Sequence, residues 1–336
     1  MPKPPRSSLH SLRLYPVKSM AGVTRDSAVV EPWGLAGDRR WTLVDDTGRV
    51  VTQRQQPRLA LIVAHTLPDG GIRLHVPGLA PLTVAVPSPV DARPSGAGVD
   101  GGTVVVDIFG TKVEAVPVTA RPSGPDGMCV TGTDGTERTR GADGGNGTDG
   151  TGGAANGTDG FGGAEDEGGV DRRLSAFLGL DVRLVHLDDP ARRRPVNPLY
   201  ARPGETVSFA DGFPLLVTTT ASLDALNSLV AQGDHPDEGP LPMDRFRPNL
   251  VVTGTAPWAE DDWQRIAVGD ITFRVTKPCG RCVITTTDQA TAERGKEPLR
   301  TLGRYRRFGG KLLFGQNLVP EATGTLRTGD PVTVLD

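Results

Sequence analysis

The sequence is poor in cysteine, in aromatic side chains and in long apolar runs. It has 3 cysteines among 336 residues, and one of them, Cys129, stands alone in a glycine-rich tract. Three thiols cannot build the disulfide framework of a small secreted domain, which fits a reducing compartment. The first residues show no apolar run followed by a small-residue cleavage site, so they do not indicate export. We therefore expect a cytoplasmic protein.

Further absences exclude classes of partner and of fold. No stretch approaches the roughly 20 apolar residues that span a bilayer, so we expect no membrane insertion. The formal net charge of −3 gives no general basic field, and we expect no nucleic-acid partner. No strand-like run is followed by Gly-x-Gly-x-x-Gly and a helix, which disfavours a doubly wound dinucleotide fold. The chain is typical of a soluble globular protein.

Short strands dominate the first third of the chain. They are rich in Val, Leu, Ile and Thr, and Gly, Pro and Asp mark the breaks between them. We expect strands at 12–17, 27–30, 40–44, 59–65, 72–76, 82–86, 103–108 and 112–116. Residues 9–120 are therefore predicted to form an N-terminal β-barrel-like domain.

The composition then changes twice. Residues 121–169 consist largely of Gly, Thr, Asp, Asn and Ala, which cannot bury enough apolar surface to offset the entropy of ordering, so we expect a disordered insertion. Residues 170–336 regain strand and helix patterns and are predicted to form a second β-rich domain. Its expected helices are 170–178 and 222–230, and its expected strands are 182–187, 249–252, 264–268, 271–275, 283–287 and 332–335. The predicted fold class is mainly β (α+β).

The segment Cys279-Gly280-Arg281-Cys282 holds the other two cysteines between two strand-like runs. Structural zinc is disfavoured because it takes four protein ligands and the chain has no second cysteine pair. A thiol-disulfide centre would need a helix after the first cysteine, whereas the β-branched run at 283–287 predicts a strand. A purely structural role for two small residues at a strand edge remains open.

The surroundings of these cysteines favour chemistry. A thiolate is stabilised electrostatically by Lys277 and Arg281, and soft thiolates suit unusual metal centres. Polar clusters elsewhere could hold the rest of a cofactor. They are Lys18 with Ser19, Arg39 with Arg40, and Arg247 with Asn249. Each cluster alone is also typical of a surface salt bridge.

Taken together and in order, these segments resemble the MOSC family, in particular the two-part proteins with an N-terminal MOSC β-barrel domain and, among them, the mitochondrial amidoxime-reducing components and their bacterial relatives. The resemblance covers almost the whole chain outside the glycine-rich tract. The matching segments include Tyr15-Pro16-Val17-Lys18-Ser19, Gly37-Asp38-Arg39-Arg40-Trp41, Gln55-Gln56-Pro57-Arg58-Leu59, Phe246-Arg247-Pro248-Asn249, Cys279-Gly280-Arg281-Cys282 and Leu313-Phe314-Gly315-Gln316-Asn317.

The resemblance implies a molybdenum cofactor, Mo-molybdopterin, whose pterin carries a dithiolene and a phosphate. It also implies that Cys282 is the catalytic residue and the thiolate ligand of the metal, and that Cys279 is a neighbour outside the ligand set. Asn317 stands where the eukaryotic relatives carry a tyrosine. The implied cofactor contacts are Lys18, Ser19, Arg39, Asp211, Gly212, Arg247, Asn249, Gly280, Arg281, Cys282 and Asn317.

The implied activity is the reduction of small N-hydroxylated compounds such as amidoximes. The sequence lacks a ferredoxin-type cysteine cluster, so electrons are expected from a separate donor protein of ferredoxin, flavoprotein or cytochrome type. Two alternatives stay open. Cys282 could carry sulfur in a sulfur-carrier or sulfurtransferase-type MOSC protein, or the chain could be a molybdenum cofactor carrier without turnover.

Overall fold

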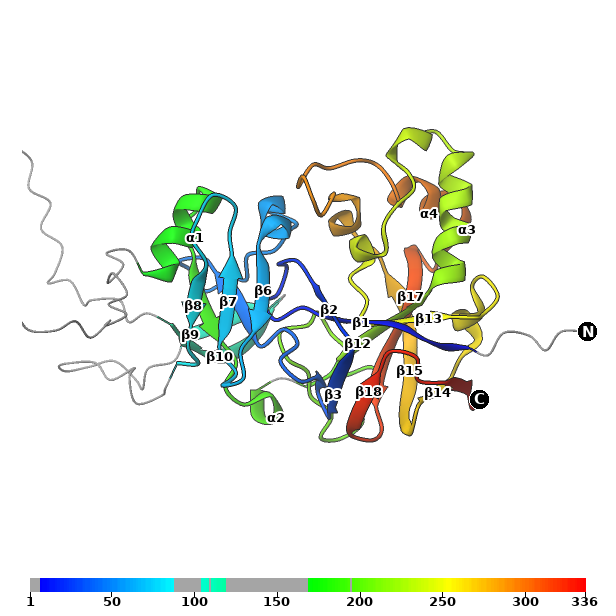
Figure 1. Ribbon diagram of the computed structural model, residues 1–336, viewed down its shortest axis with the longest axis horizontal. Coiled ribbons are helices and arrows are strands. Elements are labelled where there is room, and N and C mark those ends of the chain that lie inside the picture. Colours follow the sequence, from blue (N-terminus) through cyan, green and yellow to red (C-terminus); the bar gives the residue numbers. More distant parts are fainter. Residues whose placement is uncertain (1–6, 88–103, 109, 119–168, 194) are drawn as a thin grey trace, which may run out of the picture. The chain divides into compact units, whose positions relative to one another are not determined.

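The computed structural model describes residues 7–87, 104–108, 110–118, 169–193 and 195–336 (Figure 1). The predicted disordered insertion, 121–169, lies outside the described residues except for its last position, and the division into three parts stays a prediction. No helix among the described residues is both long enough and apolar enough to cross a membrane.

The largest sheet joins strands from both ends of the chain. Its order is β19-β14-β15-β17-β12-β13-β1-β2, and β16 pairs with β17 off this path. Only β12 and β13 run parallel among its described pairs. The bounds are β1 (Ser8–Leu14), β2 (Val23–Arg25), β12 (Leu215–Thr219), β13 (Leu250–Thr253), β14 (Arg265–Val268), β15 (Ile271–Gly280), β16 (Arg307–Phe308), β17 (Lys311–Pro320) and β19 (Val332–Val334).

The first strand, β1, belongs to this sheet because of its apolar alternation. Leu12 and Leu14 are buried in one core with Leu250 and Val252 of β13, and Leu12 lies opposite Leu250 in the antiparallel register. Side chains two residues apart on a strand share a face, so Leu12 and Leu14 face the same core, and a register shift between Leu9 and Ser11 brings Leu9 into it as well. As a result, the turn after β1 begins at the end of a strand that is held on both sides.

Smaller sheets carry the rest of the N-terminal half. One has the order β5-β11-β10-β9, a second β6-β7-β8 and a third β18-β3-β4. The bounds are β3 (Ser27–Glu31), β4 (Gly34–Leu35), β5 (Trp41–Val44), β6 (Val63–Thr66), β7 (Ile72–His75), β8 (Leu82–Val84), β9 (Val104–Ile108), β10 (Thr111–Pro117), β11 (Arg183–His186) and β18 (Gly324–Arg327). In two of these sheets, strands from before and after the glycine-rich tract pair with each other.

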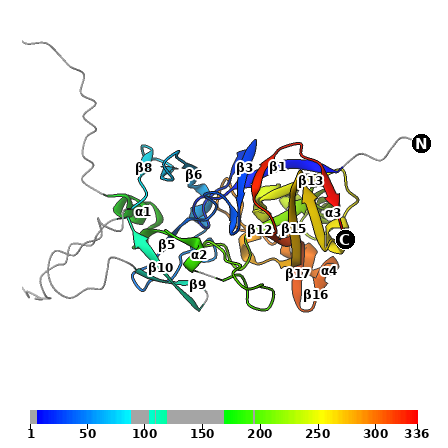
Figure 2. The same ribbon diagram turned by 90° about the horizontal axis from the view of Figure 1, so that it is seen from below.

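Helices are few and short. Figure 1 and Figure 2 show α3 beside α4, next to β17. The Thr219 side chain caps α3 by accepting a hydrogen bond from the Ser222 amide. The helices are α1 (Val170–Leu178), α2 (Pro190–Arg193), α3 (Thr220–Ala231) and α4 (Leu299–Tyr305), with single 3₁₀ turns η1 (Pro57–Leu61), η2 (Pro236–Glu238), η3 (Met243–Phe246), η4 (Ala259–Asp262) and η5 (Val283–Thr286).

The mainly β fold class is confirmed, but two predicted strands are wrong. The run at 283–287 forms the 3₁₀ turn η5, because the Thr285 and Thr286 hydroxyls donate to carbonyl oxygens three residues earlier, each at 2.8 Å. Threonine side chains that bond to nearby backbone compete with sheet pairing. The expected strand 59–65 is divided between η1 and β6, since Pro57 favours a helical first turn.

Strand β17 was missed by the sequence patterns because a glycine interrupts it. Gly315 interrupts its apolar run and has a φ of +77°, a conformation that favours glycine. A Cβ at this position would lie 2.7 Å from the carbonyl oxygen of Val217 in β12, closer than real contacts allow. Gly315 therefore permits the close approach of β17 to β12.

The buried His186 makes stability depend on pH. Its ring lies 4.4 Å from that of Trp41, and burial together with the charge of Arg40 lowers its pKa to about 4. The pKa of an unfolded histidine is about 6.5, so the unfolded chain binds the proton first as the pH falls. His186 is expected to leave the free energy of unfolding unchanged above about pH 6.5. Between about pH 6.5 and about pH 4 it should lower this free energy by about 3 kcal/mol in total.

Chemical denaturation of wild type and His186→Phe at pH 7 and pH 4 measures this effect. The phenyl ring keeps the contact with Trp41 and removes the titrating group. The variant should lose less stability than wild type on acidification, by about 3 kcal/mol. Parallel losses in the two proteins would contradict the assignment to His186.

Candidate functional site

One cavity gathers residues from distant parts of the chain. It has a volume of about 190 Å³ and is lined by the turn after β1, the loop before β12, the segment after η3, the end of β15 and part of β17. All the cofactor contacts implied by the sequence line this one cavity. They are Lys18, Ser19, Arg39, Asp211, Gly212, Arg247, Asn249, Gly280, Arg281, Cys282 and Asn317.

Backbone strain is concentrated in the wall of this cavity. Three of its residues adopt the left-handed conformation without being glycine, with φ of 67° at Ser19, 50° at Arg39 and 55° at Arg247. Among the described residues, only Trp258 and Ala292 share this property. Such conformations cost about 1–3 kcal/mol each and cluster at functional sites. The strain marks the two arginines and the serine as positioned by the surrounding fold.

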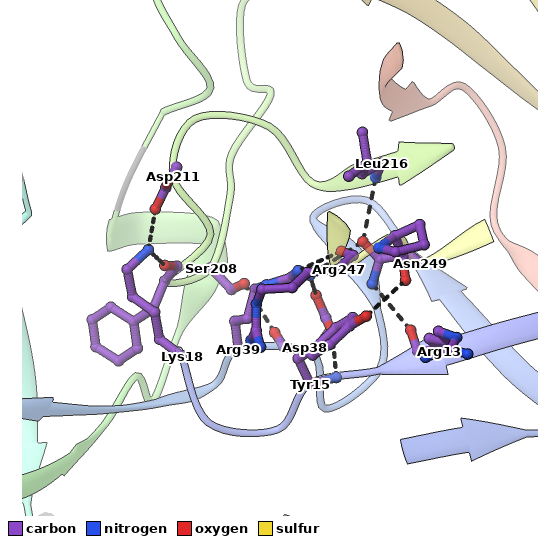
Figure 3. Close-up of polar contacts among 12 residues, drawn as sticks. Arg13, Tyr15, Lys18, Asp38, Arg39, Ser208, Asp211, Leu216, Arg247 and Asn249 are labelled. Carbon is purple, nitrogen blue, oxygen red and sulfur yellow. Dashed lines mark hydrogen bonds and ion pairs between the residues drawn. The ribbon is translucent and has the colours of Figure 1, made fainter. Parts of the chain in front are cut away.

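Two of these arginines stack on one buried tyrosine. The Tyr15 ring is 1% exposed, and the guanidinium carbons of Arg39 and Arg247 lie 4.6 Å and 4.3 Å from its centre (Figure 3). The Tyr15 hydroxyl donates to the Pro248 carbonyl at 3.2 Å, which anchors the ring. Guanidinium groups are attracted to the face of an aromatic ring. Tyr15 therefore holds two like charges side by side.

Asp38 and Asn249 hold the Arg39 guanidinium in place. Asp38 is 3% exposed, forms an ion pair with Arg39, and accepts a hydrogen bond from the Tyr15 amide at 2.9 Å. Asn249 is 1% exposed and its side-chain oxygen accepts from Arg39 at 3.1 Å and from the Leu216 amide at 3.3 Å. Its amide nitrogen donates to the Arg13 carbonyl at 3.2 Å. Asn249 thus lines the cavity but directs its polar atoms to the protein.

Arg247 has a donor without a partner. Its Nη1 donates to the Met20 carbonyl at 2.7 Å, whereas its buried Nη2 has no hydrogen bond within the described chain. Burial and the nearby charge of Arg39 lower its pKa to about 10, although Tyr15 opposes this shift. The arginine stays charged at neutral pH. A buried, charged and partly unsatisfied guanidinium is suited to an anionic ligand.

Asp211 connects Lys18 with Arg54. It forms an ion pair with Lys18 (Figure 3) and another with Arg54. Lys18 also donates to the Phe209 carbonyl at 2.7 Å. Burial alone would raise the pKa of Asp211, but the two cations more than offset it, so its pKa lies well below the usual range. Its side chain is still 56% exposed, which limits the energy that the pairs contribute. Asp211 is therefore an ionised bridge between the two cations.

The two free cysteines have different cationic neighbours. Arg281 Nη1 donates to the Cys279 sulfur at 2.9 Å, and its Nη2 donates to the Phe246 carbonyl at 2.7 Å. Arg54 interacts with the Cys282 sulfur. Burial would lower the pKa of Arg54, but Asp211 and Cys282 together outweigh burial and raise it. Arg281 directly precedes Cys282 and lines the same cavity, but its guanidinium donates to the sulfur of Cys279. The charge beside Cys282 comes from Arg54, which lies in the N-terminal half of the chain.

Comparisons with known proteins place the chain. Residues 6–105 match the MOSC N-terminal beta barrel domain, and residues 204–333 match the MOSC domain. The human mitochondrial amidoxime-reducing component 1 is 30% identical over 342 residues, which span 96% of this chain and 82% of the human protein. The chain belongs to the MOSC family.

This MOSC protein is similar to relatives with two different names. The mouse mitochondrial amidoxime-reducing component 1 is 29% identical over 340 residues, covering 96% of this chain and 81% of the mouse protein. The molybdenum cofactor sulfurase of Anopheles gambiae is 31% identical over 319 residues, covering 92% of this chain and 34% of that longer protein. Proteins named for two different activities are therefore similar to this chain over most of its length.

The cavity of this MOSC protein is strongly cationic. Within the described parts of the chain, its lining contains one carboxylate, Asp211, against the cations Lys18, Arg39, Arg54, Arg247 and Arg281. No group of three or more His, Cys, Asp or Glu side chains that could hold a metal ion occurs among the described residues.

Sequence reasoning missed several residues of this wall. Arg54 is the most informative, because it directly precedes the Gln55-Gln56-Pro57 segment that carries part of the family resemblance. Tyr15 and Asp38 support this wall without lining it, and both lay inside quoted segments, but the contacts that give them this role depend on the fold. Phe213 and Phe246 form apolar parts of the wall, and neither was expected to line the site, although Phe246 begins a segment that carries the resemblance.

Proposed function

We propose that this MOSC protein binds the molybdenum cofactor in the cavity and reduces N-hydroxylated compounds such as amidoximes. We further propose that it acts in the cytoplasm with electrons from a separate donor protein. The main support is that the Cys282 thiol, with Arg54 beside it, opens into a cavity whose other walls are cationic. Relatives named as amidoxime-reducing components favour this activity.

The residues present fit the proposed cofactor. A pterin phosphate needs cationic and hydrogen-bond donors, and the buried Arg247 Nη2 is such a donor without a partner in the described chain. Arg39 and Arg247, stacked on Tyr15, and Lys18 would hold the phosphate, while Cys282 would provide a thiolate to the metal. Arg54 places a positive charge beside the Cys282 sulfur.

When bound, the cofactor supplies the two-electron redox centre for a reaction in which R–C(NH2)=N–OH, two electrons and two protons give R–C(NH2)=NH and water. The protein positions and shields the reactants. Asp211 stays ionised at neutral pH, which keeps Lys18 and Arg54 fixed by its two ion pairs. Phe213 and Phe246 contribute apolar wall that limits the access of water.

Molybdenum analysis tests this function. Protein made in a host able to synthesise the cofactor should contain about one molybdenum per chain and reduce benzamidoxime to benzamidine with reduced methyl viologen as electron source. The same protein from a host deficient in cofactor synthesis is the control and should do neither. Metal-free protein from the competent host, together with no benzamidine formation, would overturn the proposal.

A second candidate is sulfur transfer. It is favoured by the two free thiols, Cys279 and Cys282, that line the same cavity, and by the similarity to a molybdenum cofactor sulfurase. A nucleophilic thiol next to a cation can accept sulfur as a persulfide. Mass spectrometry of the protein after incubation with a cysteine desulfurase and cysteine would show one added sulfur on Cys282 in this case.

A further inference from the structure

Two lysines lie against residues that line the cavity, although neither is itself part of the lining. The aliphatic stem of Lys311 covers Gly280, and its Cδ would lie 3.5 Å from a Cβ at that position. The Lys277 ammonium interacts both with Lys311 and with Cys279. Gly280 and Cys279 belong to the cavity wall. We call Lys277 and Lys311 the rim lysines, because both lie beside the wall segment that ends at Cys282.

An aromatic surface adjoins the rim lysines. The Lys277 Nζ lies 4.9 Å from the centre of the Tyr200 ring and 5.9 Å from that of Phe213. The two rings meet edge to face at 5.8 Å, and Phe213 also lines the cavity. Tyr200 is 36% exposed. The surface next to Phe213 and Gly280 of the cavity wall therefore combines an accessible aromatic ring with two ammonium groups.

The rim lysines lack acidic partners. Across the described residues, no ion pair involves Lys277 or Lys311, whereas the neighbouring cation Arg274 binds both oxygens of Glu205 at 2.7 Å. Partial burial and the charge of Lys311 lower the pKa of Lys277. Two like charges held together without a counter-ion destabilise each other, and an anion between them would remove that cost.

We propose that the rim lysines bind an anionic group, a carboxylate or a phosphate, of the N-hydroxylated substrate, whose apolar body packs on Tyr200 and Phe213. This inference rests on the proposed function, since it names the class of compound that the same cavity takes. The inner cations are separate from this site, because Lys18, Arg39 and Arg247 lie deeper in the wall and are fixed by Asp211, Asp38 and Tyr15.

The selectivity of the enzyme tests the proposal. Wild-type protein should reduce 4-carboxybenzamidoxime with a higher kcat/KM than benzamidoxime under viologen-driven turnover. Lys277→Met or Lys311→Met should lower kcat/KM for the carboxylated compound at least about tenfold, which corresponds to about 1.4 kcal/mol, because a charge-assisted hydrogen bond is lost. Each variant should leave kcat/KM for benzamidoxime within about twofold. Lys277→Arg should retain the preference. Lys112→Met, which removes an exposed lysine from β10, should change neither value.

Equilibrium binding tests the same site without turnover. Ligand-observed NMR should show tighter binding of benzoate or phenyl phosphate than of the neutral benzamide, with the preference lost in both methionine variants and weakened at high salt. The stronger of the two anions identifies the group. Because none of these probes is reduced, this measurement succeeds or fails independently of the proposed reductase activity.

Three outcomes would overturn the proposal. Equal affinities for the charged and neutral probes in wild type would remove the anion site. Unchanged anion binding in Lys277→Met and Lys311→Met would assign it to other residues. The third outcome is measured with an acidic [2Fe–2S] ferredoxin as electron donor. If kcat/KM falls for both methionine variants while substrate selectivity stays the same, the rim lysines dock a donor protein instead.

Discussion

Replacement of Cys282 by serine is expected to abolish both molybdenum binding and amidoxime reduction. Serine has nearly the same size but offers no thiolate, so the variant should fold normally and lose at least about 100-fold in benzamidine formation, equivalent to about 2.7 kcal/mol. Metal analysis and viologen-driven turnover of the same preparation measure the two effects. An unchanged denaturation midpoint would show that the loss is chemical.

Cys279→Ser is the matched control, because Cys279 lies three residues away in the same cavity wall. Its sulfur accepts a hydrogen bond from Arg281, and a serine hydroxyl can accept the same bond. This variant should keep its molybdenum and at least a third of wild-type activity, roughly. Equal losses in the two variants would indicate a site that uses both thiols and would favour the sulfur-transfer alternative.

Removal of the Asp38 carboxylate should cause the largest loss of stability among changes around the cavity. The two carboxylate oxygens of Asp38 accept from the Tyr15 amide and from Arg39, and Asp38→Asn replaces one of these oxygens with an NH2 donor. Arg39 then keeps its charge close to Arg247 without a carboxylate partner. Leaving a buried charge without its partner costs about 3–5 kcal/mol. Arg39 retains Asn249, so we expect a decrease of about 3 kcal/mol in the free energy of unfolding.

Urea denaturation followed by tryptophan fluorescence measures this decrease, since the buried Trp41 lies three residues from Asp38. Asp234→Asn is the control, because Asp234 forms ion pairs with Arg300 and Arg304 on the surface, where such pairs are weak. The control should leave the midpoint unchanged. Similar midpoints for Asp38→Asn and wild type would show that Arg39 needs no buried counter-ion.

The sequence predicted the identity of many cavity residues but not how they are held. Lys18, Arg39, Arg247 and Cys282 were selected by resemblance, and the structure brings them into one wall. Their supports were not predicted. Asn249 was expected to contact the cofactor, and Tyr15 and Asp38 were given no role of their own, because all three act through contacts that depend on the folded sheet. The Asn249 amide, for example, bonds to a carbonyl 236 positions earlier.

Sequence patterns predicted an element correctly where residues close in sequence determine its structure. Helix α3 was expected at 222–230 and found at Thr220–Ala231, because its cap and apolar spacing are local. The threonine-rich run after Cys282 was assigned to a strand because β-branched residues favour sheets. Its hydroxyls instead close the turn η5, and nothing in the residue types alone distinguishes the two outcomes.

The pairing of β1 with β13 has a consequence for synthesis of the chain. Arg247 reaches back 227 positions to the Met20 carbonyl, and the cavity wall is completed only by Asn317 of β17. Contacts between residues so distant in sequence form late, because a long loop must close, at a cost in entropy, before these contacts can stabilise the chain. A ribosome-bound chain without β17 thus cannot have the finished cavity, so a ligand of this cavity must enter after nearly the whole protein has been made.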